Sequence, residues 1–173
     1  GGMALLVDGM AGMGKTFLAE RAAERRGRWL LGDLRGLDAT ATARRLRAMV
    51  AELSASSAST IVLDDLGHAD DAVVRAGVAR LLGVMGRRDG SVIATCASAP
   101  SRRTLQAICG DPDVSIEAPY LTIEEVGDLA GQAGGERGSA RLVYLAGSGG
   151  HPQLVQAAIL HMRSAGWSRG AFR

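Results

Sequence analysis

The sequence predicts an α/β protein of three layers, with a five-stranded, mainly parallel sheet followed by a small helical subdomain. Over residues 1–120, short apolar runs alternate with amphipathic stretches, which is typical of right-handed βαβ units. A glycine-rich loop joins the first apolar run to the first amphipathic stretch. Beyond residue 120 the strand-like runs stop and only helical patterns follow. We therefore expect two domains, residues 1–120 and residues 121–173.

Five apolar runs have the length and composition of buried strands in a parallel sheet. Several of them end in polar side chains, which would then lie at the carboxyl edge of the sheet, where ligands bind in open α/β folds. The expected strands are Ala4–Asp8, Trp29–Leu34, Thr60–Asp65, Ser91–Cys96 and Val114–Glu117.

Three amphipathic stretches between these strands predict helices. In the second of them Leu46, Met49, Val50 and Leu53 recur at helical spacing, and an arginine cluster takes the solvent side. The expected helices are Lys15–Arg26, Thr40–Leu53 and Asp70–Met85.

The last third of the chain predicts helices only. Thr122 and Glu125 have the spacing of a capping box, and Leu121 with Val126 that of a hydrophobic staple. A second helix is expected over Ser139–Ala146. A third starts at Pro152 and carries an apolar stripe of Val155, Ala158, Ile159 and Met162.

Composition narrows the function classes. The net charge of +2 is too small and too evenly spread for a dedicated nucleic-acid surface, so we expect no direct nucleic-acid binding by this domain. No apolar run is long enough for a transmembrane helix, and no signal peptide is recognisable, so we expect no membrane association and a cytoplasmic location. Cys96 and Cys109 lack metal-ligand spacing and are expected to be buried thiols.

The octapeptide Gly9–Thr16 fits the pattern G-x-x-x-x-G-K-[ST] of a phosphate-binding loop. Such a loop turns backbone N–H groups toward an anion, and its glycines allow conformations that a Cβ would block. Lys15 would reach the β- and γ-phosphates, and the Thr16 hydroxyl would bind Mg²⁺. Lys15 is the only lysine among the 20 lysine and arginine residues of the chain, so a chance match is improbable.

Two carboxylates end the third expected strand. We expect Asp64 to hold Mg²⁺ opposite the Thr16 hydroxyl, and Asp65 to orient or deprotonate an attacking water. Thr95, at the end of the fourth strand, is a candidate to hydrogen-bond the γ-phosphate or that water, with an ordinary strand-end role as the alternative. Arg102 and Arg103 could supply charge to a transition state, although a surface role is the simpler interpretation.

In order and spacing, these motifs resemble the STAND class of P-loop NTPases, which is related to NACHT and NB-ARC domains and is AAA+-like. The resemblance rests on GMAGMGKT, TIVLDDL, SVIATCAS and LTIEEVGDLA, and on the lid signature Gly150-His151-Pro152-Gln153-Leu154. It implies ATP or ADP with Mg²⁺ as cofactors, and a helical lid whose Pro152 packs near the adenine base. The nucleotide-binding residues then implied are Gly9, Met10, Ala11, Gly12, Met13, Gly14, Lys15, Thr16, Phe17 and Pro152, with Lys15, Asp65 and Thr95 as catalytic residues and Thr16 and Asp64 as metal ligands.

The resemblance implies a switch module of a larger signalling, defence or regulatory protein. Such a module alternates between an ADP-bound closed state and an ATP-bound open state that forms homo-oligomers, and flanking sensor and effector domains of the same chain are its partners. The chain starts shortly before its first strand and ends just past the lid, so we expect it to be a fragment of such a protein.

Two departures keep alternatives open. Cys96-Ala97-Ser98 stands where many relatives carry a phosphate-sensing arginine, and Asp65 is shorter than the glutamate that many relatives place near the metal aspartate. The first departure leaves room for a module that binds nucleotide without hydrolysing it, and the second favours slow hydrolysis. An AAA+-type motor or loader ATPase is the other alternative.

Overall fold

The computed structural model describes residues 3–97, 99–109, 114–168 and 170. Its sheet has five strands in the order β2-β3-β4-β1-β5, and every pair of neighbours is parallel. The expected sheet is thus confirmed, with β1 and its following loop between β4 and β5. The strands are β1 Met3–Asp8, β2 Trp29–Asp33, β3 Thr60–Asp64, β4 Ser91–Cys96 and β5 Val114–Glu117.

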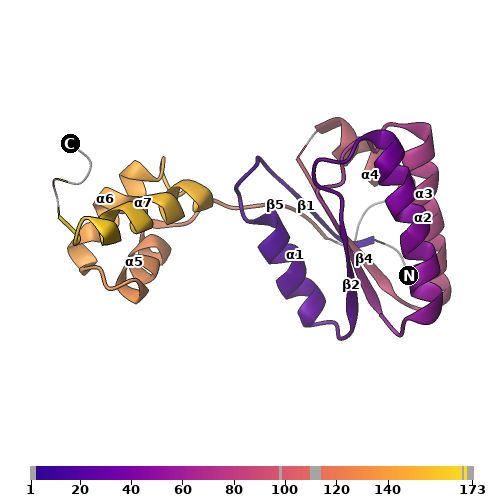
Figure 1. Cartoon of the computed structure of the whole chain (residues 1–173), viewed down its shortest axis with the longest axis horizontal. Helices are drawn as coiled ribbons and strands as arrows, with labels where there is room; N and C mark the ends of the chain where they lie inside the picture. The colour runs from indigo at the N-terminus through magenta and orange to yellow at the C-terminus, as the bar shows by residue number, and fades with distance from the viewer. Residues whose placement is uncertain (1–2, 98, 110–113, 169, 171–173) are drawn as a thin grey trace. The chain divides into compact units, whose positions relative to one another are not determined.

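Helices cover both faces of the sheet, which makes the three expected layers (Figure 1). Helix α1 packs on one face through Ala19 and Ala23, against Val62 and Ile93 of the central strands. The other face carries α2, α3 and α4. The helices are α1 Lys15–Glu24, α2 Ala39–Ala55, α3 Ala72–Arg87 and α4 Ala99–Cys109.

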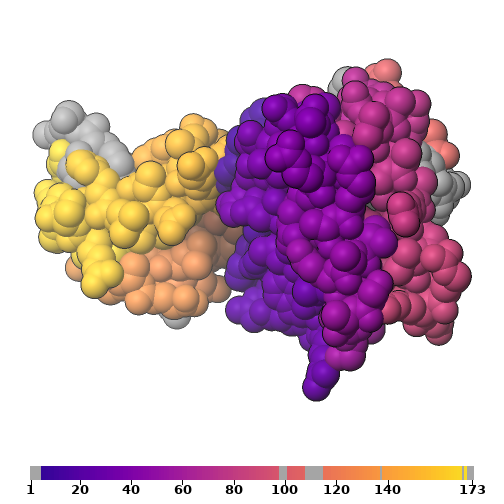
Figure 2. Space-filling view, turned by 45° about the vertical axis from the view of Figure 1, so that its right-hand side comes forward, coloured from indigo at the N-terminus to yellow at the C-terminus, as the bar shows by residue number. Residues whose placement is uncertain are grey.

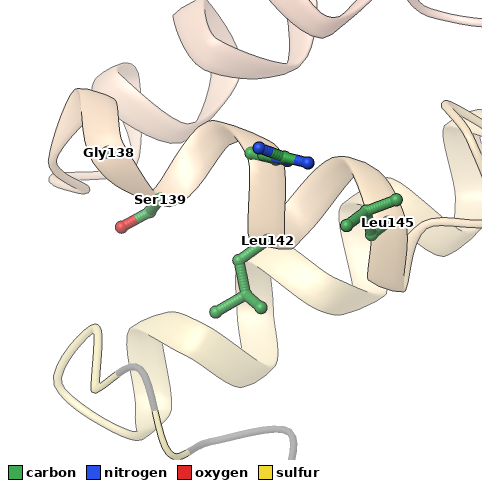
Figure 3. Close-up of a pocket in the computed structure, with 5 residues that line it drawn as sticks. Gly138, Ser139, Leu142 and Leu145 are labelled. Atoms are coloured by element: carbon green, nitrogen blue, oxygen red, sulfur yellow. The ribbon is translucent and has the colours of Figure 1, made fainter.

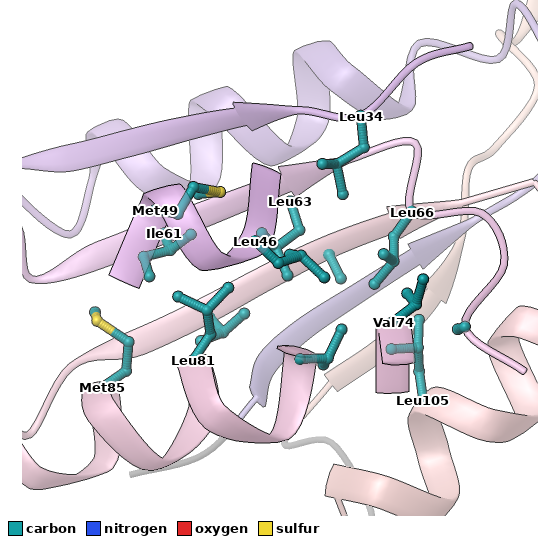
Figure 4. Packing of buried hydrophobic residues seen from close by; sticks show 14 of the residues in the cluster. Leu34, Leu46, Met49, Ile61, Leu63, Leu66, Val74, Leu81, Met85 and Leu105 are labelled. Carbon is teal, nitrogen blue, oxygen red and sulfur yellow. The ribbon is translucent and has the colours of Figure 1, made fainter. Parts of the chain in front are cut away.

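The larger core lies between the sheet and α2 and α3 (Figure 4). It is built almost wholly from aliphatic side chains and methionine, as the low aromatic content requires. The stripe expected on α2 is confirmed in three of its four positions: Leu46, Met49 and Leu53 are fully buried, whereas Val50 is half-buried. The labelled core residues are Leu34, Leu46, Met49, Ile61, Leu63, Leu66, Val74, Leu81, Met85 and Leu105.

Several expected boundaries were wrong by one or two residues. Helix α1 ends at Glu24, not Arg26, and α3 starts at Ala72 because the Asp71 carboxylate caps it by accepting from the N–H groups of Val73 and Val74. Strand β3 ends at Asp64, and Asp65 leaves the sheet with a φ of +57°. Helix α4 was not expected at all, because its first half, which includes Arg102 and Arg103, is mostly polar and its buried Leu105 comes only after this start.

By the contacts between Cα atoms the chain divides into two compact units, residues 1–10 with 15–118 and residues 11–14 with 119–173. Figure 2 shows their side chains, with residues 15–118 of the first unit in indigo to rose and the part of the second unit after residue 118 in orange to yellow. The second unit contains α5 Ile123–Gln132, a 3₁₀ turn at Arg137–Ser139, α6 Ala140–Ala146 and α7 Pro152–Ser164.

The helical unit has a core of its own. Val126, Val143, Val155, Ile159 and Met162 are its main buried side chains, and the expected stripe on α7 is confirmed. The capping box also forms: Thr122 accepts from the N–H of Glu125, and the Glu125 carboxylate accepts from the N–H of Thr122.

Helix α7 begins at Pro152 without a side-chain cap, as expected for a proline in the first turn. Within the same unit, the backbone N–H of Gln153 donates to the carbonyl of Gly12 over 3.2 Å. None of the helices in the described part of the chain combines the length and apolar character that crossing a membrane requires.

The turn before α7 depends on Gly150. Its φ is +98°, and a Cβ at this position would lie 2.0 Å from the carbonyl oxygen of Leu121, whose own N–H donates to the Gly150 carbonyl. Gly149 also has a positive φ, of +74°, but a Cβ there would meet nothing closer than 4.0 Å.

We predict that Gly150→Ala destabilises the helical unit more than Gly149→Ala. Both variants place a side chain in the left-handed region, at a cost of about 1–2 kcal/mol, but only Gly150→Ala also pushes into backbone. Urea unfolding followed by Trp167 fluorescence, in a Trp29→Phe background, measures the difference because Trp167 packs on the helical core. Equal destabilisation by the two variants would contradict the prediction.

Candidate functional site

The loop from Gly9 to Thr16 has the backbone that its glycines allow. Gly9, Gly12 and Gly14 have φ values of +138°, +79° and +78°, which lie in the region that residues other than glycine rarely adopt. Helix α1 begins at Lys15, directly after the loop. The strand, loop and helix N-terminus therefore follow one another as in a phosphate-binding site.

Lys15 is turned into its own loop. Its Nζ donates to the carbonyls of Gly9 and Met10, over 2.9 and 2.8 Å, and the residue is only 8% exposed. A buried ammonium needs such acceptors, since an unpaired one would be costly. The loop thus holds the Lys15 ammonium against its own backbone carbonyls.

Thr16 and Asp64 meet at the start of α1 and the end of β3. The Thr16 hydroxyl lies 2.9 Å from both carboxylate oxygens of Asp64 and donates to that carboxylate. Asp64 is 1% exposed. The two expected metal ligands, 48 residues apart in the chain, are therefore in contact.

Thr95 links the two aspartates. Its Oγ1 donates to Oδ1 of Asp64 over 2.8 Å and accepts the backbone N–H of Asp65 over 2.7 Å. Thr95 is fully buried, so these partners satisfy its hydroxyl without water. The structure places Thr95 as a support for Asp64 and for the turn at Asp65, whose side chain is half-buried.

Arg35 and Asp33 also lie at this edge of the sheet, although neither belongs to a sequence motif. Asp33 ends β2 and pairs with Asp64 in the sheet register. Arg35 donates from Nε and a terminal nitrogen to both carboxylate oxygens of Asp33, over 2.9 and 2.6 Å. Its Nε lies 3.7 Å from Oδ2 of Asp64. Hydrogen bonding to Arg35 lowers the pKa of Asp33 from 3.8 to about 2.

A second ion pair lies at the end of β1. Arg102 donates to Oδ2 of Asp8 over 2.5 Å, and 12% of the Asp8 side chain is exposed. Arg102 is thus paired rather than free at the surface, although its side chain stays 46% exposed. Beside this pair, burial raises the pKa of the Cys96 thiol to about 11, and the charge of Asp8 adds to the effect.

Five of the expected site residues come together. Lys15, Thr16, Asp64, Asp65 and Thr95 come together at the carboxyl edge of the sheet, where Thr16, Asp64, Thr95 and the Asp65 backbone form one hydrogen-bonded set. Met10 and Phe17 are exposed at 61% and 59%, and Arg21 lies over the Phe17 ring at 5.2 Å. Pro152 is the first residue of α7 in the helical unit. The side chain of Cys109 lies outside the described part of the structure.

The pair of Thr16 and Asp64 fits Mg²⁺. This ion prefers oxygen ligands and is usually held by one or two carboxylates, with phosphates and waters as its other ligands. The described residues contain no group of three or more His, Cys, Asp or Glu side chains that could hold a metal.

The helical unit contains a hollow of its own (Figure 3). It measures about 260 Å³ and is lined by Gly138, Ser139, Arg141, Leu142 and Leu145. This lining offers one hydroxyl and one guanidinium, and it contains none of the candidate site residues.

Solved structures of AAA+ P-loop ATPases share the fold of this chain. DnaA from Aquifex aeolicus with bound AMPPCP matches with a TM-score of 0.68 and 15% identity, over 99% of this chain and 58% of DnaA. A RuvB variant from Thermotoga maritima matches at 0.65 and 17%, over 94% and 54%. Orc1 from Aeropyrum pernix in complex with DNA matches at 0.65 and 14%, over 99% and 55%.

The chain therefore has the fold of AAA+ P-loop ATPases, and it spans a little more than half the length of these proteins. No protein-family model and no curated protein matches it.

We predict that Thr95→Val lowers the stability of the α/β unit by about 1–3 kcal/mol, because it leaves the Asp65 N–H and one bond to the buried Asp64 carboxylate unmade. Thr95→Ser keeps the hydroxyl and is the matched control, expected to lose less. Thermal unfolding followed by circular dichroism measures both variants. A Val variant as stable as the Ser variant would show that the hydroxyl is not needed there.

Proposed function

We propose that the chain is an ATP-binding, Mg²⁺-dependent and slowly hydrolysing switch module of a larger signalling, defence or regulatory protein. Its proposed parts are a nucleotide-binding domain, residues 1–120, and a helical lid, residues 121–173. The observation that carries the proposal is the contact of Thr16 with Asp64 directly after the glycine loop. That pairing supplies a metal-binding hydroxyl and carboxylate beside a phosphate nest.

The roles of the residues follow from their chemistry. Lys15 would leave the carbonyls of Gly9 and Met10 and turn its ammonium to the β- and γ-phosphates. Thr16 and Asp64 would hold Mg²⁺, which supplies charge stabilisation to the phosphates when it is bound. Thr95 would keep Asp64 in place, and Asp65 would orient the attacking water.

Slow hydrolysis is the part of the proposal that rests on Asp65. Its carboxylate is one methylene shorter than glutamate, and its backbone is held at a φ of +57° by the bond to Thr95. A carboxylate that must reach a water from a shorter side chain is less able to meet the geometry that general-base catalysis requires. Slow hydrolysis would keep the module in its ATP-bound state for long periods, as a switch requires.

A switch also needs its lid to bind differently in the two nucleotide states, since a ligand shifts an equilibrium only through differential affinity. Residues 11–14 of the phosphate loop group with the helical unit, and Gln153 donates its backbone N–H to Gly12. This bond gives the start of α7 a direct connection with the phosphate loop. Packing of Pro152 near the base is part of this proposal.

An AAA+ motor or loader ATPase is the second candidate, and the fold favours it equally. One similar structure, Orc1, is in complex with DNA, and DnaA carries a nucleotide analogue. Such a function for this chain would require rapid turnover in an assembled state. The turnover rate of ATP in the full-length protein therefore separates the two candidates.

We predict that Lys15→Ala weakens ATP and ADP binding by at least about tenfold, because a charge-assisted bond to phosphate is lost. Arg25→Ala removes a positive charge from an exposed residue just beyond α1 and serves as the control. Isothermal calorimetry gives both affinities. Asp64→Asn should retain binding without metal and lose the gain that Mg²⁺ brings. If Lys15→Ala binds ATP and ADP as tightly as the wild type does, the assignment of Gly9–Thr16 as a phosphate-binding loop is contradicted.

We predict that hydrogen exchange over residues 121–165 differs between the ADP state and the state with a non-hydrolysable ATP analogue. The physical reason is that the γ-phosphate acts on the loop, to which the start of α7 is bonded. Mass spectrometry of the wild type and of Lys15→Ala, which should lose the difference, makes the comparison. If both nucleotides bind and hydrogen exchange of the lid is the same with each, the switch hypothesis is wrong and the chain is a module that only binds nucleotide.

A further inference from the structure

The Asp64 carboxylate has the guanidinium of Arg35 as a neighbour. Arg35 Nε lies 3.7 Å from Oδ2 of Asp64, which is also one of the two oxygens within 2.9 Å of the Thr16 hydroxyl. The other oxygen, Oδ1, takes the hydroxyl of Thr95. The guanidinium therefore stands at the Asp64 oxygen that a metal shared with Thr16 would use.

Asp33 holds this guanidinium to one side. Arg35 makes two side-chain bonds to the Asp33 carboxylate, and its backbone N–H donates to the same carboxylate over 3.1 Å. Its distance from Asp64 is longer than a hydrogen bond, so the contact is electrostatic only. Asp33 and Asp64 face each other in the sheet register, so a small shift of the side chain would exchange one carboxylate for the other.

We propose that Arg35 is a built-in competitor of Mg²⁺ at Asp64, and that Asp33 sets its strength by drawing the guanidinium aside. The inference rests on the proposed function, because it assigns Asp64 to a metal. Arg35 neutralises the buried carboxylate while no metal is present and repels a cation that approaches Oδ2. The pair thus raises the Mg²⁺ concentration at which the metal site is half-saturated, and makes loading of the site sensitive to that concentration.

The two residues predict opposite effects. Arg35→Gln removes the competing charge and should lower the Mg²⁺ concentration for half-saturation by about two- to fivefold, the range for an exposed ion pair. Asp33→Asn frees the guanidinium to turn fully to Asp64 and should raise that concentration. Both side chains are largely exposed, at 61% and 45%, so neither variant is expected to impair folding.

The measurement is a Mg²⁺ titration of the full chain with bound fluorescent ADP. The affinity for ADP without metal is measured separately in EDTA, and electron paramagnetic resonance of bound Mn²⁺ is a second readout of the metal site. Arg21→Gln is the matched control, because Arg21 forms an equally exposed pair with Glu24, at 62% and 49%, on the surface of α1. It should leave the Mg²⁺ requirement unchanged, and all variants should bind ADP in EDTA as the wild type does.

Three results would overturn the inference. Arg35→Gln could leave the Mg²⁺ requirement unchanged, it could raise it, which would make Arg35 a support for the metal site, or it could weaken ADP binding in EDTA, which would make Arg35 a phosphate ligand. A wild-type chain that fails to bind ADP both with Mg²⁺ and in EDTA would contradict the proposed function itself. The two failures are therefore distinguishable.

Discussion

The buried carboxylate of Asp64 is the constraint on which the rest of the site depends. A charged group that is 1% exposed is stable only when hydrogen bonds or opposite charges replace the water it has lost. Here α1 contributes the hydroxyl of Thr16, β4 the hydroxyl of Thr95, and the segment after β2 the guanidinium of Arg35. One carboxylate is thus approached by side chains from three other segments of the chain.

The strand order makes this convergence possible. Because β3 lies between β2 and β4, residues that follow its neighbours reach Asp64 from either side. Asp33 is opposite Asp64 in the register, and the N–H of Leu34 donates to the carbonyl of Asp64 over 3.0 Å. A different order of the same strands would keep the glycine-rich loop intact and would separate Arg35 from Oδ2 of Asp64.

This dependence explains what the sequence could predict and what it could not. The phosphate loop and the acid pair are local patterns of fixed spacing, so the strand, loop and helix were predictable from neighbouring residues alone. The contact between Arg35 and Asp64 joins residues 29 positions apart and requires the strand order, which a motif does not contain. Helix α4 was missed for a related reason: Leu105 shows its role only when α3 and the sheet are in place to cover it.

Both charges of the site are already satisfied by the chain itself, and this shapes how a ligand would bind. Lys15 is held by the carbonyls of Gly9 and Met10, and Asp64 by two hydroxyls and a nearby guanidinium. A phosphate would have to replace the first set and a metal the second. Lys15 and Thr16 are adjacent in the first turn of α1, so each replacement moves a neighbour of the other. Binding of nucleotide and of metal should therefore be coupled, and by linkage the coupling acts equally in both directions.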